Sequence, residues 1–201
     1  WKVASENKTL LKQVLRTYNI ELEIFRDTEW FDQAEDTISE IEKFLKDFRY
    51  KIPKEYLVSF WFQLANINFF SENYSATLRW VNEILNHNFK DVRMDLQRHI
   101  RFLNLMAHFE QKNFFVMRYF VDNTRRYLKK TGKIEPYEKE LLRFFSKISK
   151  IPYAEIKDEF ISLKDRLFPS EKESLISHST SDYINFERWI DRNITSKTLN
   201  Y

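Results

Sequence analysis

Apolar residues recur along this chain with the period of an α-helix. One stripe runs through Ala34, Ile38, Ile41, Leu45 and Phe48, and three more of the same spacing follow it between residues 57 and 128. A half-buried strand would instead alternate apolar and polar residues with a period of two. The pattern predicts helices near residues 8–27, 31–48, 53–70, 74–88, 92–111, 114–130, 136–149, 153–167 and 182–194.

Proline and glycine divide the chain between these helices. Pro53, Pro136, Pro152 and Pro169 each precede or open an apolar run. Each is expected to start a helix, because the first helical turn does not need the N–H that proline lacks. The only glycine, Gly132, follows a run of cations, as at many helix C-termini. Since hairpin turns favour glycine, a chain with one glycine is predicted to be all-α.

One sequence pattern, at the junction between two predicted helices, occurs twice: in "FFSENYSATLRWVNEIL" at 69–85 and in "HFEQKNFFVMRYFVDNT" at 108–124. Each copy has an aromatic residue, polar residues, asparagine, a second aromatic residue and then a helical pattern. The asparagine is expected to cap the second helix, and Tyr74 or Phe114 to fill the space between the two helices. A weaker copy places Phe31 in the same position, and the spacings are 43 and 40 residues. This spacing predicts a solenoid of two-helix repeats.

The segment "WFQLANINFFSENYSATLRWVNEIL" resembles a degenerate tetratricopeptide repeat. Five residues match the family's Trp, Leu, small residue, Tyr and Leu: Trp61, Leu64, Ala65, Tyr74 and Leu85. The family's small residue in the second helix is Ala34 in the first copy, but Thr77 and Met117 in the others, and the spacing exceeds the usual ~34 residues. The segment "RFLNLMAHFEQKNFFVMRYFVDNTRRYLKKTGKIEPYEKELLRFFSKI" also resembles the C-terminal part of uncharacterised tetratricopeptide-like proteins of Bacteroidetes, and this similarity covers about residues 53–194.

The resemblance implies a right-handed solenoid of antiparallel helical hairpins. Residues 1–150 would hold hairpins at about 8–48, 53–88 and 92–130 and a helix at 136–149, and residues 151–201 a helical cap packed on them. The whole is expected to be one continuous domain. Because the chain begins without Met and inside a helical pattern, we expect it to belong to a longer protein.

The same resemblance implies a peptide-binding groove. In tetratricopeptide proteins the first helix of each hairpin lines the concave face. Carried over by position, that face holds Phe62, Asn66, Phe70, His99, Phe102 and Met106. Aromatic, Met and amide side chains suit an adaptable groove for a peptide. The alternative for each aromatic residue is a place in the core.

Composition argues against several other classes of protein. Without cysteine the chain makes no disulfide and has no thiolate, which favours a reducing compartment and a cytoplasmic location. No apolar run reaches the 18 residues of a membrane span. The four histidines are scattered and no glycine-rich loop exists, so we expect no metal, no cofactor and no catalysis. A non-catalytic scaffold that binds a protein or peptide is the main prediction.

Charge is distributed unevenly along the chain. Residues 21–47 carry ten acids and three bases, whereas residues 89–133 carry eleven bases and four acids. One hypothesis is that these two blocks meet between copies in a salt-sensitive contact. The basic block contains a patch of Arg118, Arg125, Arg126, Lys129 and Lys130. Binding of nucleic acid by this patch, with Tyr119 or Tyr127 stacking on bases, is the lesser prediction, and stabilisation of a helix C-terminus is the simpler alternative.

Overall fold

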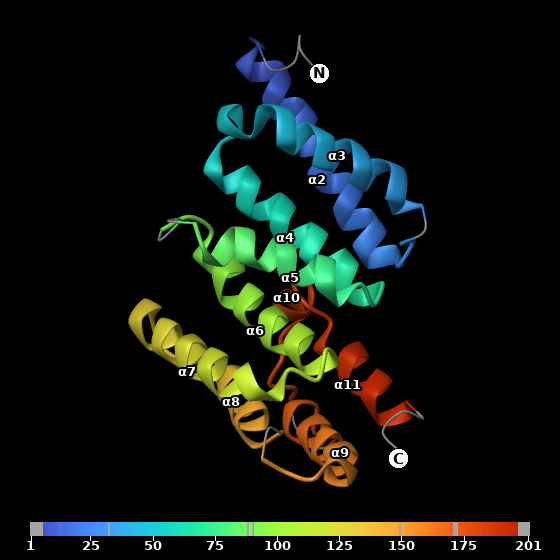
Figure 1. The fold of residues 1–201 in the computed structure, drawn as a ribbon, viewed down its shortest axis with the longest axis vertical. Coiled ribbons are helices and arrows are strands. Elements are labelled where there is room, and N and C mark those ends of the chain that lie inside the picture. The colour runs from blue at the N-terminus through green and yellow to red at the C-terminus, as the bar shows by residue number, and fades with distance from the viewer. Residues whose placement is uncertain are drawn as a thin grey trace. The chain divides into compact units, whose positions relative to one another are not determined.

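The computed structural model of the chain describes residues 6–31, 33–87, 89, 91–148, 150–170 and 173–196. These residues form helices and no strand, which confirms the all-α prediction (Figure 1). The longer helices are α2 (Lys8–Thr28), α3 (Ala34–Phe48), α4 (Lys54–Phe70), α5 (Tyr74–Leu85), α6 (Met94–Glu110), α7 (Phe114–Thr131), α8 (Pro136–Ile148), α9 (Ile156–Leu167) and α11 (Phe186–Thr195). Short helical segments are η1 (Arg49–Lys51), η2 (Tyr153–Glu155) and α10 (His178–Ser181).

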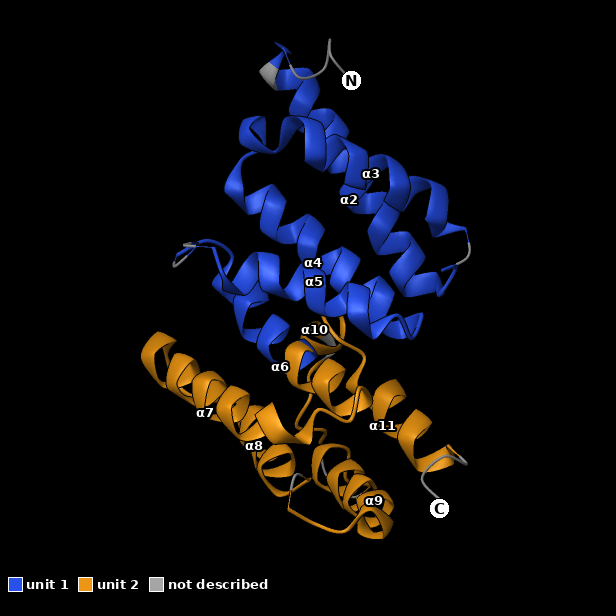
Figure 2. Ribbon diagram, in the orientation of Figure 1, with its two compact units in different colours: residues 1–103 blue, residues 104–201 orange. Residues whose placement is uncertain are grey.

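The chain divides into two compact units, residues 1–103 and residues 104–201 (Figure 2). In the first unit α4 packs against α2 and α5, and α2 packs against α3. In the second unit α8 packs against α7 and α9, and α11 packs against α9. The boundary between the units falls inside α6. The arrangement of repeats in residues 1–150 and a cap in residues 151–201 stays a prediction. The solenoid and its handedness stay a prediction.

The prolines mark helix starts at three of the four expected places. Pro136 is the first residue of α8, and Pro53 and Pro152 directly precede α4 and η2. The expectation for Pro169 is wrong, because no helix starts among the described residues from 169 to 177. Here the chain turns back onto the end of α9. The Leu175 N–H donates to the Leu167 carbonyl at 2.9 Å, which satisfies an acceptor that a continuing helix would otherwise use.

The two copies of the repeated junction form the same turn. Asn73 N–H donates to the Asn68 carbonyl at 2.8 Å, and Asn113 N–H donates to the His108 carbonyl at 2.9 Å. In each turn the preceding residue, Glu72 or Lys112, has positive φ, 62° and 57°. These are the features of a Schellman motif, in which a left-handed residue ends the helix.

Only one of the two asparagines caps its helix with its side chain. The Asn73 side chain accepts from the Ala76 N–H at 3.2 Å, as predicted. Asn113 makes no such bond, and its amide instead donates to Gln111 Oε1 at 2.9 Å. The prediction of a side-chain cap by Asn113 is therefore wrong: the amide NH2 is engaged within the turn, and the side chain accepts no bond from the first turn of α7.

Gly132 ends α7 in a conformation that side chains exclude. Its φ of 150° and ψ of −160° lie in a region that is essentially restricted to glycine. The predicted helix end is confirmed, and the one glycine of the chain occupies a position that needs it.

Aromatic side chains form the centre of the second unit. Trp189 on α11 lies within 6.0 Å of Phe109, 5.7 Å of Phe145 and 5.1 Å of Phe160, measured between ring centroids. Its indole N–H donates to Glu110 Oε1 at 2.7 Å, so the one polar atom of the ring is satisfied. The predicted docking of the last helix through Phe186, Trp189 and Ile190 is confirmed, since all three are buried.

A membrane span is not found among the helices that the structure describes, since none of them is both long enough and apolar enough to cross a bilayer.

Candidate functional site

The six residues of the predicted peptide groove are all buried. None of them exposes more than 7 % of its surface: Phe62, Asn66, Phe70, His99, Phe102 and Met106. In this structure they belong to the core and offer no open groove to a peptide. Their burial agrees with the alternative interpretation of the sequence, in which these aromatic residues belong to the core.

The burial of α4 explains this outcome. From Leu57 to Ile67 every residue of the helix is buried, on all of its faces, because α2 and α5 both pack against it. A helix that is apolar all round has no surface face. His99 on α6 is also held within the protein, where its Nδ1 lies 2.8 Å from the Asp95 carbonyl and burial lowers the pKa of its imidazole.

His87 and His108 lie in separate environments. Among the described residues no group of three or more His, Cys, Asp or Glu side chains is placed to hold an ion. His108 stacks on Phe120 at 4.4 Å, and burial lowers the pKa of its imidazole. The side chain of His178 is not part of what the structure describes. His87 has a different environment, at the edge of a pocket.

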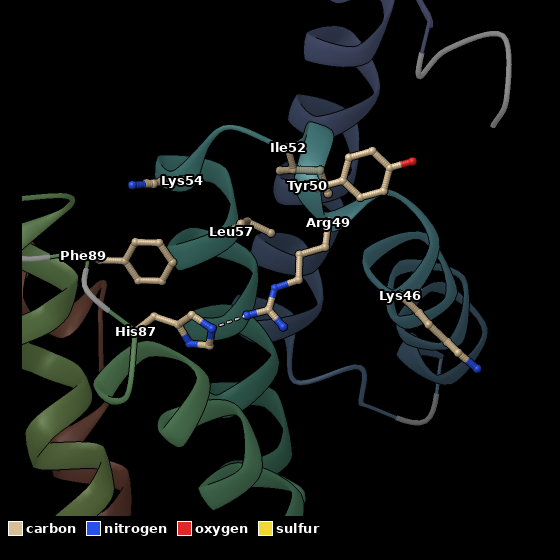
Figure 3. A pocket seen from close by; sticks show the side chains of 8 residues that line it. All are labelled: Lys46, Arg49, Tyr50, Ile52, Lys54, Leu57, His87 and Phe89. Atoms are coloured by element: carbon tan, nitrogen blue, oxygen red, sulfur yellow. Dashed lines mark hydrogen bonds between the residues drawn. The ribbon is translucent and has the colours of Figure 1, made fainter.

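This pocket, which we call the Arg49 pocket, is an open depression of about 530 Å³ in the first unit (Figure 3). Its volume falls within the range of small-ligand sites. Its lining comes from the end of α3, from η1 and the start of α4, and from the segment after α5. The apolar lining consists of Ile52, Leu57 and Phe89, and the polar lining of Lys46, Arg49, Tyr50, Lys54 and His87.

Three contacts fix the guanidinium of Arg49. Its Nη2 lies 2.9 Å from Glu83 Oε2 and 2.6 Å from His87 Nε2, and its Cζ lies 4.8 Å from the centre of the Trp61 ring. An arginine stacked on a tryptophan and paired with a carboxylate has lost most of its rotamer freedom before any ligand arrives. The side chain is nevertheless 40 % exposed, so the fixed cation faces solvent.

The hydrogen bonds of His87 determine its tautomer. Because arginine only donates, His87 Nε2 accepts from Arg49 at 2.6 Å. The proton therefore resides on Nδ1, which donates to the Glu83 carbonyl at 2.7 Å. Both ring nitrogens are engaged, so neither is left to take a proton from a substrate.

Three aromatic rings pack together at the pocket. Trp61 lies 5.5 Å from His87 and 5.7 Å from Phe89, and the rings of His87 and Phe89 stack at 5.5 Å. The Gln97 amide holds the segment of Phe89, since it donates to the carbonyls of Phe89 and of Val92. Figure 3 shows Arg49 and His87 pointing toward each other, whereas the ends of Lys46 and Lys54 point away from this pair. The site thus offers one fixed cation beside an apolar wall.

The predicted basic patch lies on α7 and remains largely accessible. Arg118, Arg126, Lys129 and Lys130 are exposed, whereas Arg125 is half-buried. Arg125 pairs with Asp122 at 3.2 Å and donates to Ser146 Oγ at 3.3 Å, so it contributes to the contact between α7 and α8. Four of the five cations therefore remain as candidates for a ligand.

Two aromatic side chains share the exposed side of α7 with these cations. Phe115 is 99 % exposed and Tyr119 is 63 % exposed. The sequence identified Tyr119 as a stacking residue but not Phe115. The sequence does indicate that Phe115 is exposed, because it lies outside the apolar stripe that α7 buries. That stripe consists of Met117, Val121, Thr124 and Leu128.

Sequence reasoning missed the Arg49 pocket altogether. Its key residues, Arg49, Trp61, Glu83 and His87, come from separate segments and form no motif at a fixed spacing. Their only local signal is the pair Glu83 and His87, four residues apart at the end of a helix.

Comparison of the chain with protein-family models, with curated proteins and with solved structures finds no match. Two surfaces of the described residues are candidates for function, the Arg49 pocket and the exposed side of α7.

Proposed function

We propose that this chain is a non-catalytic scaffold that binds a protein partner, and that the Arg49 pocket recognises an acidic residue next to an apolar one in that partner. The observation that supports this most directly is the position of Arg49, fixed by Glu83, His87 and Trp61 at the edge of an apolar wall. A guanidinium held in this way pairs with a carboxylate at little cost in side-chain entropy.

The lining of the pocket favours a peptide over a purely ionic ligand. Ile52, Leu57 and Phe89 offer apolar contact beside the cation, and lysines at the rim add a diffuse positive field. An Asp or Glu followed by Leu, Ile or Phe would use both parts. Because both nitrogens of His87 are engaged, a binding role fits this site better than general base catalysis.

The wider setting agrees with a binding role by analogy only. Tetratricopeptide-like hairpins, which the repeated junction predicts, present extended surfaces to partners. We place the protein in the cytoplasm, because the absence of cysteine from this sequence suits a reducing compartment.

The test begins with selection of peptides from a random display library on the immobilised protein. Enriched peptides should carry an acidic residue next to an apolar one. A selected peptide, labelled with fluorescein, should bind the protein with an affinity that Arg49→Gln lowers at least tenfold. Replacement of the acidic residue in the peptide by its amide should have a similar effect, since either change removes the same ion pair.

Arg79 supplies a matched control within the same unit. It also pairs with a glutamate, Glu42 at 2.6 Å, and lies over a tryptophan ring, Trp80 at 4.5 Å, but it does not line the pocket. Arg79→Gln should leave the peptide affinity unchanged. Selected peptides that bind Arg49→Gln and Arg79→Gln equally well would remove the proposal.

We also propose a weaker contact between copies of the chain, in which the acidic block of residues 21–47 meets the basic block of residues 89–133. Exposed acids on α3, Glu35, Asp36 and Asp47, support it. Screening by salt should weaken such a contact. Sedimentation velocity at 50 and 500 mM salt should show self-association only at low salt, and a monomer under both conditions would exclude it.

A further inference from the structure

The exposed side of α7 combines aromatic and cationic side chains in one stripe. We call this stripe the outer face of α7, and it consists of Phe115, Arg118, Tyr119, Arg126, Lys129 and Lys130. Residues 115, 119, 126 and 130 follow one another at spacings of four, seven and four, so they lie along one side of a helix. At 1.5 Å per residue the stripe is about 22 Å long.

The opposite side of the helix is buried in the core. Met117, Val121, Thr124 and Leu128 are buried, and α7 packs against α8. The outer face is therefore held on a fixed element. Its orientation does not require a bound ligand.

The charges on this side are arranged to favour an anion. Asp122 is an exposed acid between Tyr119 and Arg126, and it is paired with Arg125 at 3.2 Å, which reduces its repulsion of a phosphate. Arg126 donates to Asn123 through Nη2 and is otherwise directed to solvent as an exposed side chain. Simple stabilisation of the helix C-terminus would explain Lys129 and Lys130 in the last turn, but not Arg118 in the first half of the helix.

The aromatic rings point to the kind of anion. Phe115 and Tyr119 are one turn apart, and Tyr119 packs edge-on against Phe120 at 5.3 Å, which limits its rotation. Phe120 is itself stacked on His108 at 4.4 Å. Exposed rings next to cations are the combination by which proteins hold single-stranded nucleic acid, where bases stack on rings and phosphates contact the cations.

We propose that the outer face of α7 binds single-stranded nucleic acid. The two rings stack on adjacent bases, and the four cations contact phosphates on the same strand. This function is independent of peptide recognition at the Arg49 pocket, because it uses other residues and another unit.

Other anionic partners fit the outer face less well. An interfacial helix needs a broad apolar face, whereas the apolar face of α7 is buried in the protein and the outer face offers two large rings. An extended peptide binds in a groove or along a sheet edge, whereas the outer face is the convex side of one helix. A nucleic-acid duplex would meet the cations, but its bases are already stacked and leave the rings without a partner.

The experiment measures fluorescence anisotropy of a fluorescein-labelled 12-nucleotide mixed-sequence strand, as DNA and as RNA, at salt concentrations from 50 to 200 mM. Phe115→Ala/Tyr119→Ala should lower the affinity at least tenfold and leave the salt dependence unchanged, because stacking involves no counterion release. Arg126→Ala/Lys130→Ala should lower affinity for every sequence and reduce the slope of log affinity against log salt by about 1.4. All six side chains are exposed, so these variants should fold, which circular dichroism checks.

Lys139→Ala/Arg143→Ala is the matched control, since it removes two exposed cations from α8 in the same unit. It should change neither affinity nor slope. Three results would overturn the proposal: no binding at 50 mM salt, binding of a duplex as tight as that of the single strand, or binding that the aromatic pair does not affect. Equal affinity for poly-glutamate would point instead to a charge-only contact and would also reject it.

Discussion

The rings of Phe109 and Phe114 lie 5.9 Å apart at an angle of 66°, one on each side of the turn between α6 and α7. Phe69 and Tyr74 have the same relationship across the turn between α4 and α5, at 5.6 Å and 60°. Each pair closes a turn whose backbone hydrogen bonds are the same. The repeated junction in the sequence therefore encodes one local structure, in which two aromatic residues five apart pack together and a left-handed residue reverses the chain.

The left-handed residue leads to the first prediction. Lys112 has φ of 57°, a conformation that costs a residue with a Cβ atom roughly 1–2 kcal/mol and costs glycine little. Lys112→Gly should therefore unfold with a free energy about 1 kcal/mol greater than Lys112→Ala, the reverse of the order inside a helix. Both variants lose the contact of Lys112 with the Tyr153 ring, so that loss cancels in the comparison. Urea denaturation of the two proteins measures the difference.

Gly132 leads to the second prediction, of opposite sign. Its φ of 150° and ψ of −160° are closed to residues with a Cβ atom, so Gly132→Ala should lower the free energy of unfolding by about 1–3 kcal/mol. Thermal or urea denaturation followed by circular dichroism measures this loss. Lys130→Ala, an exposed residue in the last turn of the same helix, should change stability little. A loss equal to that of the control would show that the end of α7 tolerates a side chain.

The sequence predicted the helices well because their causes are local. Apolar period, proline and glycine act within a few residues of one another, and so the observed helix bounds lie within a few residues of most predictions. Two local expectations, a helix start at Pro169 and a side-chain cap by Asn113, were wrong. After Pro169 the chain turns back, and the Leu175 N–H donates to the Leu167 carbonyl. Asn113 makes no side-chain cap, although it occupies the position at which Asn73 makes one in the first copy of the junction.

The predicted groove failed at a different level. A position carried over from a repeat family assigns Phe62 and Asn66 to a concave face, but burial depends on how many helices surround α4. Apolar residues dominate all sides of the helix from Leu57 to Ile67, with only three polar residues among them, and this already indicates full burial. The Arg49 pocket could not be predicted from the sequence, because Arg49 and His87 are 38 residues apart and no sequence pattern connects them.

A buried carboxylate in the second unit gives the third prediction, for pH. Burial raises the pKa of the Glu159 carboxyl, but hydrogen bonds from Lys147 and Arg166 outweigh it and bring the pKa below its ordinary value of 4.5. Arg166 also pairs with Glu140 at 2.7 Å, so these four residues join α8 to α9. A folded-state pKa below the unfolded value means that the unfolded chain takes up the proton first.

Stability from Glu159 should therefore be present above pH 4.5 and should fall as the pH drops from there through the lower pKa of the folded protein. Urea denaturation between pH 3 and pH 7 should show a steeper loss for the wild type than for Glu159→Gln, which carries no proton to exchange. Asp158→Asn removes an exposed acid one residue away and should keep the wild-type slope. Equal slopes for wild type and Glu159→Gln would show that the ion pairs of Glu159 do not control the acid response.

Glu110 gives the last prediction, because one of its oxygens accepts bonds from three side chains of α11. Oε1 lies 2.7 Å from Trp189 Nε1, 3.0 Å from Asn193 Nδ2 and 3.3 Å from Arg192 Nη2. Glu110→Ala leaves the indole N–H and the amide within the protein without this acceptor, which should lower the free energy of unfolding by roughly 1–3 kcal/mol. Glu110→Gln keeps an acceptor oxygen and should lose less. Glu187→Ala, which removes an exposed acid from α11, should be nearly neutral in the same urea denaturation. If Glu110→Gln and Glu110→Ala lost the same amount, the charge of Glu110 and its pairing with Arg192 would carry the contact, and the acceptor for Trp189 would not.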